Sequence, residues 1–293
     1  MQELRDRVAV VTGAASGIGL GMAQAFAAEG MKLMLADVES EPLQRAVEAL
    51  AAEGAAVVGV ECDVSKASAV EALRDRSLAE FGAVHVLCNN AGVGGGSFGA
   101  LWEAPFDEWE WVMGVNLMGV VYGVRSFVPA MIEGRAPGHV VNTASMAGLI
   151  HGAGIYGISK HAVVALSEAL FSQLGNQQHP IGVSVLCPGW VRTNIMTSER
   201  NRPEAPRPAP DAGAAQLELI RGLMERFVQG GLDPLEVGRL VVRAIRDERF
   251  YVLTHPHWAN MVRNRMETIL DGRHPVGAAP ADEGQWFEEP AQG

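Results

Sequence analysis

The sequence predicts a doubly wound α/β fold of the Rossmann type, with a parallel sheet of about seven strands and helices on both faces. Three observations predict it. Short valine-rich runs alternate with longer helical patterns, a glycine-rich turn separates the first run from the first helix, and the runs are apolar throughout, as in strands covered on both faces. The alternation persists to about residue 273, which indicates one domain over residues 1–274.

The expected strands and helix starts follow in chain order. The strand-length runs are VAVVT (8–12), KLMLA (32–36), AVVGVE (56–61), VHVLC (84–88), HVVNTA (139–144), GVSVLC (182–187) and FYVL (250–253). The residues Ser40, Glu41 and Pro42 open one helix, and Ser65 is expected to cap another. Asp233 and Pro234 begin a late helix, because proline is tolerated where an N–H has no partner within the helix.

Three later segments have their own signatures. Residues 198–213 hold four prolines, which favours an extended loop, and we expect residues 194–232 to form a lid over the substrate. Residues 257–271 read as an amphipathic helix that either covers the domain's own edge or reaches a neighbouring subunit. Residues 275–293 predict a flexible tail, in which Trp286 and Phe287 are the residues that could dock.

Composition and charge exclude several classes of protein. The chain has 293 residues and a net charge of −11, so we expect neither nucleic acid nor a membrane as a partner. No signal peptide is recognised at the N-terminus, and no stretch approaches the roughly 18 apolar residues of a membrane span. Cys62, Cys88 and Cys187 are far apart and predict buried free thiols in the cytoplasm. The eight histidines lack metal-ligand spacing, so no metal site is expected.

The turn after the first run predicts a dinucleotide site. Glycines there allow a tight turn, so that a pyrophosphate can approach the first N–H groups of the helix. The candidate residues are Gly13, Ser16, Gly17, Ile18 and Gly19. Asp37 follows the second run, where its carboxylate would accept both ribose hydroxyls and repel a 2′-phosphate. Because neither Ser16 nor Val38 is an arginine, NAD is favoured over NADP as the cofactor.

An ordered set of motifs then identifies a family resemblance. The motifs are TGAASGIG (12–19), the acid Asp37, CDVS (62–65), NNAG (89–92), VNLMG (115–119), NTASMAG (142–148), YGISK (156–160) and CPGWVRT (187–193). With them, residues 6 to about 255 resemble the short-chain dehydrogenase/reductase family of the compact single-domain type. The resemblance implies an NAD(P)-dependent oxidoreductase that interconverts a secondary alcohol and a ketone by hydride transfer.

Tyr156 and Lys160 are the expected centre of catalysis. Positions four apart share one face of a helix, so both side chains would enter the same site. An adjacent ammonium is expected to lower the pKa of the phenol from about 10 and so to favour the phenolate. Tyr156 then acts as the general base or acid for the substrate oxygen, and the resemblance implies that Lys160 also holds the ribose hydroxyls of the cofactor.

The resemblance assigns the remaining roles. Ser145 would stabilise charge on the substrate oxygen, although counting back from Tyr156 selects Thr143, and alternation puts both on one strand face. Asn116 matches the asparagine that kinks a helix and anchors a water leading protons to the lysine, while a buried structural asparagine would look the same. The residues that match cofactor contacts are Asp63 and Val64 at the adenine, Asn90, Ala91 and Gly92 beside the adenosine ribose, and Pro188, Gly189, Val191 and Thr193 facing the nicotinamide.

Substrate and assembly are less closely defined by the sequence. The variable parts are residues 93–106, 146–155 and the segment after Thr193. An apolar pocket is expected from Met146, Ile155, Trp190, Ile195 and Met196, which favours a bulky or aromatic secondary alcohol or the matching ketone. Family members are usually joined through helices near residues 107–133 and 156–174, so the resemblance implies a homodimer or homotetramer.

Other functions were weighed against the oxidoreductase. An epimerase or lyase with transient hydride transfer usually has the extended branch's GxxGxxG pattern, whereas this chain has GxxxGxG. A catalytically silent dinucleotide-binding scaffold would be expected to have lost Tyr156 or Lys160. A zinc-dependent alcohol dehydrogenase needs Cys and His ligands at metal spacing, a pattern that the sequence does not show.

Overall fold

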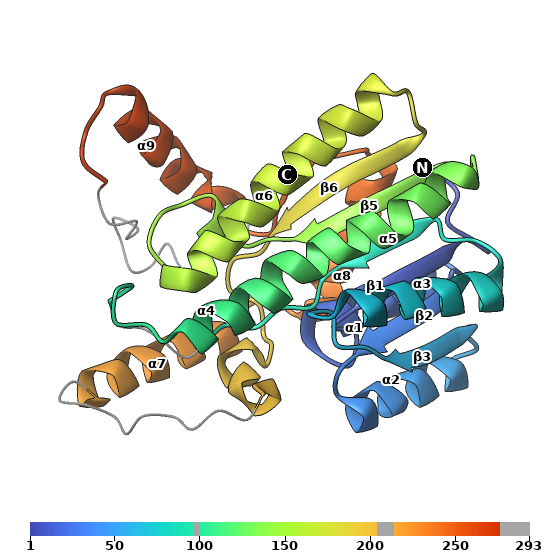
Figure 1. Cartoon of the computed structure of the whole chain (residues 1–293), viewed down its shortest axis with the longest axis horizontal. Coiled ribbons are helices and arrows are strands. Elements are labelled where there is room, and N and C mark those ends of the chain that lie inside the picture. Colours follow the sequence, from blue (N-terminus) through green and yellow to red (C-terminus); the bar gives the residue numbers. More distant parts are fainter. Residues whose placement is uncertain (96–99, 204–213, 276–293) are drawn as a thin grey trace.

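The computed structural model describes residues 1–95, 100–203 and 214–275. Its centre is one sheet in the order β3-β2-β1-β4-β5-β6-β7, and each pairing is parallel (Figure 1). This order confirms the predicted doubly wound fold. The strands are β1 (Val8–Thr12), β2 (Lys32–Asp37), β3 (Val57–Glu61), β4 (Val86–Asn89), β5 (Gly138–Thr143), β6 (Ile181–Cys187) and β7 (Tyr251–Leu253).

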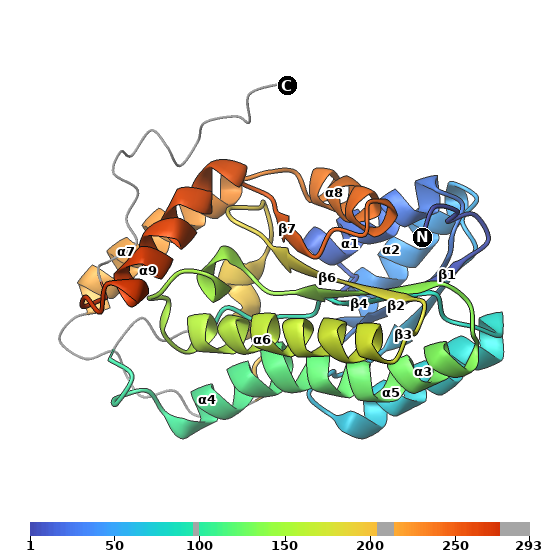
Figure 2. The same ribbon diagram turned by 90° about the horizontal axis from the view of Figure 1, so that it is seen from above.

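Helices cover both faces of this sheet. Figure 2 shows α3, α5 and α6 on one face and α1, α2 and α8 on the other. The α-helices are α1 (Gly17–Ala28), α2 (Ser40–Ala52), α3 (Ala67–Phe81), α4 (Phe106–Met113), α5 (Gly119–Glu133), α6 (Gly154–Asn176), α7 (Ala214–Gln229), α8 (Pro234–Arg246) and α9 (Ala259–Leu270). A π-helical turn, η1 (Gly114–Met118), joins α4 to α5, and three 3-10 turns are η2 (Met146–Gly148), η3 (Ile195–Asn201) and η4 (Pro256–Trp258).

The central strands are buried as expected, but the edge strand β3 is not. All residues of β1 and β4 are buried, because helices pack on both sides of them. In β3, Gly59 and Glu61 are exposed and the other residues only partly buried. The expectation that this run is covered on both faces is therefore wrong, since an edge strand has a neighbour on one side only.

Helix starts agree with the sequence at one position and differ at another. The Asp233 carboxylate accepts a hydrogen bond from the Leu235 amide at 2.8 Å and caps α8, as predicted. Ser65 does not cap α3, because its hydroxyl donates to the Asp63 carboxylate at 2.7 Å and the cap position belongs to Lys66. The competing carboxylate two residues earlier explains the wrong prediction.

The continuous helix from α4 to α5 corrects another sequence expectation. Residues 106–133 are long and apolar enough to cross a membrane by length and composition alone. The core helix of a soluble protein has the same properties, and Val112, Val120 and Phe127 on this helix are buried within the protein. The apolar residues of this helix contribute to the core beside the sheet.

Two glycines allow α1 and α8 to pack with their backbones in close contact. A Cβ at Gly21 would lie 2.1 Å from the Pro234 carbonyl oxygen, and one at Gly238 would lie 2.1 Å from the Gly21 carbonyl oxygen. We expect Gly21→Ala to lower the free energy of unfolding by about 2–3 kcal/mol, because the two helices must separate. Urea denaturation measures this change.

Gly175 in α6 provides the matched control for that prediction. No atom would lie within 4 Å of a Cβ at Gly175. Gly175→Ala should therefore raise the free energy of unfolding by about 0.5–1 kcal/mol through helix propensity alone. Equal stability of the Gly21→Ala variant and the wild type would contradict the close packing of α1 on α8.

The C-terminal helix α9 packs on the domain along part of its length, and Arg265 in its middle donates to the Leu149 carbonyl at 3.2 Å. Trp258, just before the helix, is buried, and Met261 and Val262 pack against its cluster. Met266 and Ile269 are 47% and 56% exposed, and Figure 1 shows α9 extending away from the sheet. Both expected roles of this helix, covering the domain's own edge and reaching a neighbouring subunit, therefore stay predictions. The predicted tail lies outside the described residues from residue 276 onward.

Candidate active site

The carboxyl ends of β1, β4 and β5 are joined by Thr12 and Asn90. The Thr12 hydroxyl accepts hydrogen bonds from the amides of Asn90 and Ala91 at 2.9 and 3.1 Å. The Asn90 side chain donates to the Thr12 carbonyl at 3.0 Å and accepts from the Thr143 hydroxyl at 3.2 Å. These bonds fix the floor of the site before any ligand binds. Sequence reasoning did not select Thr12, although it is the first residue of the glycine motif.

The glycine loop has the shape that a pyrophosphate needs. Gly13 and Gly17 have φ angles of +65° and +54°, and a Cβ at Gly19 would lie 2.0 Å from the Gly13 carbonyl oxygen. Ser16 stands at the N-cap of α1, but its side chain makes no capping hydrogen bond. The first N–H groups of α1, from Gly17 and Ile18 onward, therefore lack both helical partners and a side-chain cap, so this end of the helix suits an anionic ligand.

Asp37 lies beside this loop at the end of β2. One carboxylate oxygen accepts a hydrogen bond from the Ala15 amide at 2.9 Å, and the other accepts from the Glu39 amide at 3.0 Å. Burial raises the pKa of Asp37, and the two amide hydrogen bonds oppose that shift. Each oxygen keeps a second lone pair, with which it could accept a ribose hydroxyl. Val38, which follows, is 45% exposed.

The turn after β3 lies next to Asp37. The Cys62 amide donates to the Asp37 carbonyl at 2.9 Å, which places Asp63 and Val64 beside the end of β2. The Asp63 carboxylate accepts from the amide and the hydroxyl of Ser65, and Val64 is buried. The structure thus brings the residues predicted to contact adenine and ribose to one edge of the sheet.

Ser145, Tyr156 and Lys160 lie together above the ends of β5 and β6. The side chains of Tyr156 and Ser145 are hydrogen-bonded to each other. The Lys160 ammonium donates to the Thr143 carbonyl at 3.0 Å and lies 5.7 Å from the centre of the Tyr156 ring. Because the Thr143 hydroxyl is bonded to Asn90, the geometry favours Ser145 over Thr143 as the hydroxyl that serves the substrate oxygen.

Burial dominates the electrostatics of this group. It raises the pKa of Tyr156, against the effect of the Ser145 hydrogen bond, and it lowers the pKa of Lys160 to about 8. The expectation of a lowered phenol pKa is therefore wrong here, since the loss of hydration is the largest effect on Tyr156. Both shifts favour the uncharged forms of the two groups.

Asn116 occupies the π-helical turn η1 and is fully buried. Its side-chain oxygen accepts from the Val93 amide at 2.8 Å, and its nitrogen donates to the Val93 carbonyl and the Ser159 hydroxyl, both at 3.0 Å. The Ser159 hydroxyl donates to the Tyr156 carbonyl at 2.7 Å. Asn116 thus connects the interrupted helix to the loop after β4 and to the catalytic helix. Ser159 was not selected from sequence, and its place within YGISK was the available signal.

The turn after β6 completes the site. The Pro188 carbonyl accepts from the Met146 amide at 2.8 Å, and the Gly189 amide donates to the Thr254 hydroxyl at 2.9 Å. Val191 forms an isolated β-bridge with Leu232. Thr193 lies against the glycine loop, because a Cβ added at Gly17 would lie 3.1 Å from the Thr193 Cγ2 atom. A Cβ at Gly92 would lie 3.3 Å from the Lys160 nitrogen, so this glycine lies directly beside the lysine side chain.

The residues expected to line an apolar pocket divide into two groups. Met146 and Ile155 are only 2% and 5% exposed and pack into separate core clusters, and their part in an apolar pocket stays a prediction. Trp190 stacks on Phe227 of α7 at 5.4 Å, while Ile195 and Met196 are partly exposed. Met196 lines a pocket of about 200 Å³ between η3 and α7. Residues 96–99 and 204–213 of the expected variable loops lie outside the described residues.

The described ranges contain no group of three or more His, Cys, Asp or Glu side chains arranged to hold a metal ion. The residues near the reacting centre are instead a hydroxyl, a phenol and an ammonium, which act through protons and hydrogen bonds. The glycine loop and Asp37 suit the phosphates and ribose of a dinucleotide.

Comparison with known proteins decides the family. Residues 7–204 match the family described as short chain dehydrogenase. The chain belongs to the short-chain dehydrogenase/reductase family. A crystal structure of a short-chain dehydrogenase/reductase from Burkholderia phymatum in complex with NAD is 47% identical, covers 94% of this chain and 99% of its own, and superposes with a TM-score of 0.90.

Two relatives of known name have comparable length. The 1-deoxy-11-beta-hydroxypentalenate dehydrogenase of Streptomyces exfoliatus is 34% identical, over 98% of this chain and 96% of its own. The C alpha-dehydrogenase of Sphingobium sp. is 32% identical, over 96% of this chain and 90% of its own. These likenesses support NAD(P)-dependent oxidoreduction for this short-chain dehydrogenase. The roles given to individual site residues stay predictions.

Proposed function

We propose that the protein is an NAD-preferring alcohol dehydrogenase or ketoreductase that interconverts a bulky or aromatic secondary alcohol and its ketone. The observation that carries this proposal is the group formed by the partly buried Ser145 and Tyr156 and the buried Lys160, in which a phenol and a hydroxyl are hydrogen-bonded to each other beside an ammonium. The glycine loop and Asp37 lie along the same edge of the sheet and suit a dinucleotide.

The chemistry divides between the cofactor and the chain. When bound, the nicotinamide accepts or donates the hydride. In alcohol oxidation, Tyr156 as phenolate takes the hydroxyl proton while Ser145 donates a hydrogen bond to the substrate oxygen. The charge of a protonated Lys160 would favour the phenolate and so oppose the burial that raises the pKa of the phenol, and Asn116 holds the catalytic helix through Ser159. In ketone reduction, Tyr156 returns the proton to the same oxygen.

Asp37 supports the preference for NAD. Both of its oxygens are held by backbone amides, so the carboxylate has a fixed orientation beside the glycine loop. A 2′-phosphate next to a carboxylate would be repelled, whereas ribose hydroxyls would be accepted. The NAD complex of the Burkholderia phymatum protein agrees with this preference.

Aromatic side chains support a bulky substrate. Trp190 follows the Pro188–Gly189 turn and is stacked on Phe227, with Trp258 edge-on at 6.0 Å. Aromatic surfaces of this kind favour apolar, ring-containing ligands over sugars or phosphate esters. One of the two named relatives is a dehydrogenase named for a hydroxypentalenate, and the other is a C alpha-dehydrogenase.

The proposal is tested by titrating NAD and NADP in parallel against a panel of aryl and alicyclic secondary alcohols and the matching ketones. We expect NADH formation with at least one aryl alcohol and a value of kcat/KM for NAD about 100-fold above that for NADP. An equal or greater value for NADP would overturn the assigned preference. Tight NADH binding without turnover of any panel member would instead overturn the substrate class.

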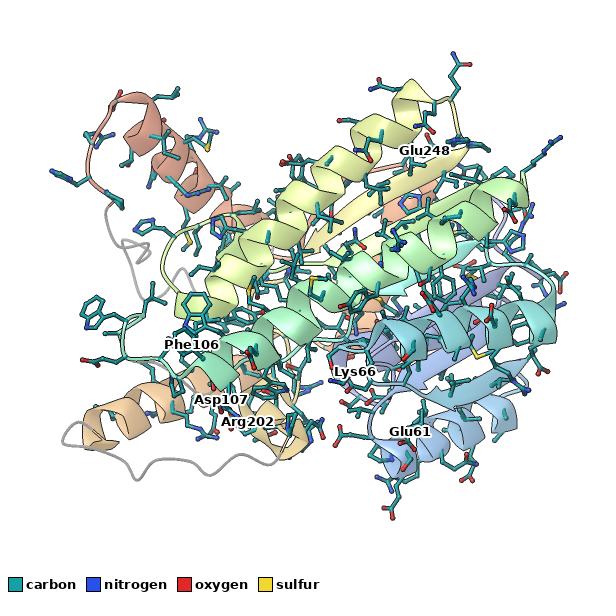
Figure 3. All side chains as sticks on the ribbon, in the orientation of Figure 1. Glu61, Lys66, Phe106, Asp107, Arg202 and Glu248 are labelled. Atoms are coloured by element: carbon teal, nitrogen blue, oxygen red, sulfur yellow. The ribbon has the colours of Figure 1, made fainter. Side chains whose placement is uncertain are left out.

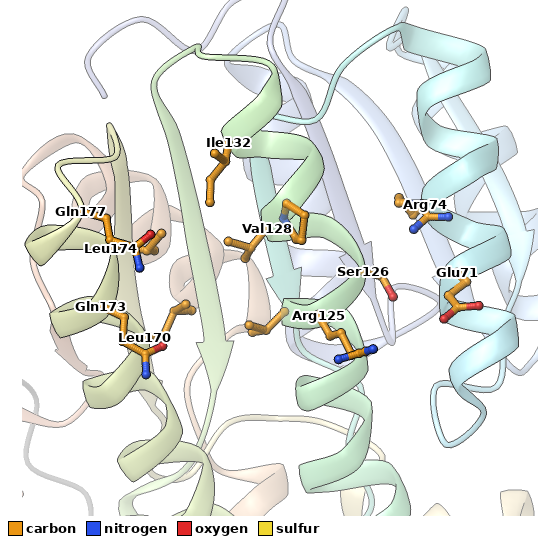
Figure 4. Close-up of a pocket in the computed structure, with 12 residues that line it drawn as sticks. Glu71, Arg74, Arg125, Ser126, Val128, Ile132, Leu170, Gln173, Leu174 and Gln177 are labelled. Carbon is orange, nitrogen blue, oxygen red and sulfur yellow. The ribbon is translucent and has the colours of Figure 1, made fainter.

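We also propose that the protein is a homodimer or homotetramer joined through α5 and α6. A groove of about 580 Å³ lies between these helices and α3 (Figure 4). Its lining includes the apolar Val128, Leu170 and Leu174 and the polar Glu71, Arg74, Arg125, Gln173 and Gln177. A second copy of the chain could fill it with apolar and hydrogen-bonding side chains. Light scattering is expected to give two or four times the chain mass of 31.2 kDa. A monomer at micromolar concentration would contradict this assembly.

A cytoplasmic location is proposed as well. Cys62, Cys88 and Cys187 are buried and free, and burial raises the pKa of the Cys62 thiol to about 11 and that of Cys187 to about 12. Free protonated thiols are typical of proteins in reducing compartments. Fractionation of cells that express the protein tests this location.

A further inference from the structure

Two arginines at the end of η3 reach carboxylates in different parts of the molecule. Arg200 pairs with Glu39, in the loop between β2 and α2, and Arg202 pairs with Asp107 and Glu108 at the start of α4. Figure 3 labels Arg202 and Asp107 near the start of α4. The segment 194–202 is thus attached on the dinucleotide side by one arginine and on the opposite side by the other.

The Arg200–Glu39 pair is bidentate. Nε donates to one carboxylate oxygen at 2.8 Å and Nη2 donates to the other at 2.6 Å. The side chain of Asn201 also hydrogen-bonds Glu39. The guanidinium is fixed to its own segment, since Nη1 donates to the carbonyls of Asn194 and Thr197 at 3.3 and 3.0 Å. Because the planar guanidinium is hydrogen-bonded both to Glu39 and to its own segment, it moves only together with that segment.

Glu39 belongs to the surroundings of Asp37. Its amide donates to the Asp37 carboxylate at 3.0 Å, and the other oxygen of Asp37 accepts from Ala15 of the glycine loop. At the near end of the same segment, Thr193 lies against Gly17. The segment therefore runs from the glycine loop to the end of β2, where Arg200 fastens it to the residue two positions after Asp37.

The charges around the Arg200–Glu39 pair affect which ribose 2′-substituent the site can accept. Asp37 and Glu39 place two carboxylates at the end of β2, and Arg200 interacts electrostatically with both. The guanidinium is committed to Glu39 by two hydrogen bonds, so it is not available to an incoming phosphate. Without Glu39, the same cation would stand beside the position at which the ribose 2′-substituent is expected from the role of Asp37.

We propose that Arg200 and Glu39 form part of the dinucleotide site, where their ion pair retains the adenosine half of the cofactor and prevents Arg200 from accepting a 2′-phosphate. This inference rests on the proposed function, because it assumes that Asp37 receives the adenosine ribose. Arg202 is the contrasting anchor. It stacks over Trp111 at 5.2 Å and pairs with α4, so it holds the segment without touching the nucleotide side.

The first experiment measures how fast NADH leaves the protein. The dissociation rate is followed by NADH fluorescence in stopped flow for the wild type and for Arg200→Met, Glu39→Gln and the double variant. We expect each single change to raise the rate about fivefold, and the double variant to match the single variants, because the two residues act through one contact. Additive effects, or no change in rate, would overturn the retaining role.

Arg192, two residues before this segment, provides a matched control for the first experiment. Arg192 pairs with Asp233 at 2.5 Å, and both side chains are about as exposed as Arg200 or more so. Asp233, the partner of Arg192, caps α8 and is distant from Glu39 in the sequence. Arg192→Met should leave the NADH dissociation rate within about twofold of wild type. A fivefold increase there would mean that any loosening of the segment suffices, which contradicts a specific role of Arg200.

The second experiment measures the affinities of NADH and NADPH by the same fluorescence signal. Glu39→Gln is expected to lower the ratio of the NADPH to the NADH dissociation constant about tenfold, and Arg200→Met in that background should restore the ratio. An unchanged ratio in Glu39→Gln would overturn the role in rejecting a 2′-phosphate. If the wild type binds neither cofactor, the proposed function fails as well, whereas normal binding with unaffected variants overturns this inference alone.

Discussion

Replacing Tyr156 by phenylalanine is expected to lower kcat about 10³-fold while leaving the NADH dissociation constant within about twofold of wild type. The phenol supplies the proton that the substrate oxygen gains or loses, and it is hydrogen-bonded to Ser145. The ring itself remains in Tyr156→Phe, so packing around the half-buried side chain is kept. Steady-state kinetics with a substrate identified by the alcohol panel measures the effect.

The chain has three tyrosines, which provides a control for this change. The Tyr251 hydroxyl donates to Glu168 at 2.6 Å at the edge of the sheet. Tyr251→Phe removes one hydroxyl outside the catalytic group, and kcat should stay within about twofold of wild type. If Tyr156→Phe retained more than a tenth of wild-type activity, Tyr156 would not be the general acid and base.

Replacing Lys160 by methionine is expected to abolish activity and, at pH 7, to raise the free energy of unfolding by about 1–2 kcal/mol. Burial lowers the pKa of Lys160 from 10.5 to about 8, which corresponds to about 3 kcal/mol lost when the charged group is buried. Methionine removes this penalty but leaves the Thr143 carbonyl without its hydrogen-bond donor. The lost hydrogen bond cancels part of the increase in the free energy of unfolding. Urea denaturation of both proteins gives the difference.

The pH dependence provides an independent check on the Lys160 prediction. Below about pH 8 both folded and unfolded chains hold the lysine proton, so the penalty is complete. Between about 8 and 10.5 the unfolded chain holds more protons than the folded one, so wild-type stability rises with pH and the advantage of the variant shrinks. The exposed Lys66 serves as control, since Lys66→Met should show no such window. A variant less stable than wild type at pH 7 would contradict the prediction.

The fold and family could be predicted because their signals are local in the sequence. Each strand is a continuous apolar run, and the glycine loop and YGISK are short motifs, so the sheet and the family were both identified from the sequence and confirmed. A local motif gives a wrong prediction where a second group competes for the same hydroxyl. Ser65 was expected to cap α3, but its hydroxyl donates to the Asp63 carboxylate instead. The choice between Thr143 and Ser145 depended on loop length, which counting could not resolve.

Other features of the site depend on burial or on contacts distant in sequence. The pKa of Tyr156 was predicted to fall, but the sequence does not give the degree of burial that raises it. Arg200 and Glu39 are 161 positions apart, so no spacing rule could connect them. Met146 is apolar either way, and only the packed structure places it in the core.

The contact of Gly189 with Thr254 has a consequence for how the protein is made. Thr254 and Trp258 lie behind the turn after β6, and a Cβ at Gly189 would lie 2.9 Å from the Trp258 ring. A ribosome synthesises these residues after the glycine loop, Asp37 and the catalytic helix, while earlier parts of a chain can already begin to fold. A nascent chain could therefore form its nucleotide-binding half early and would acquire a supported catalytic turn only when β7 and Trp258 have emerged.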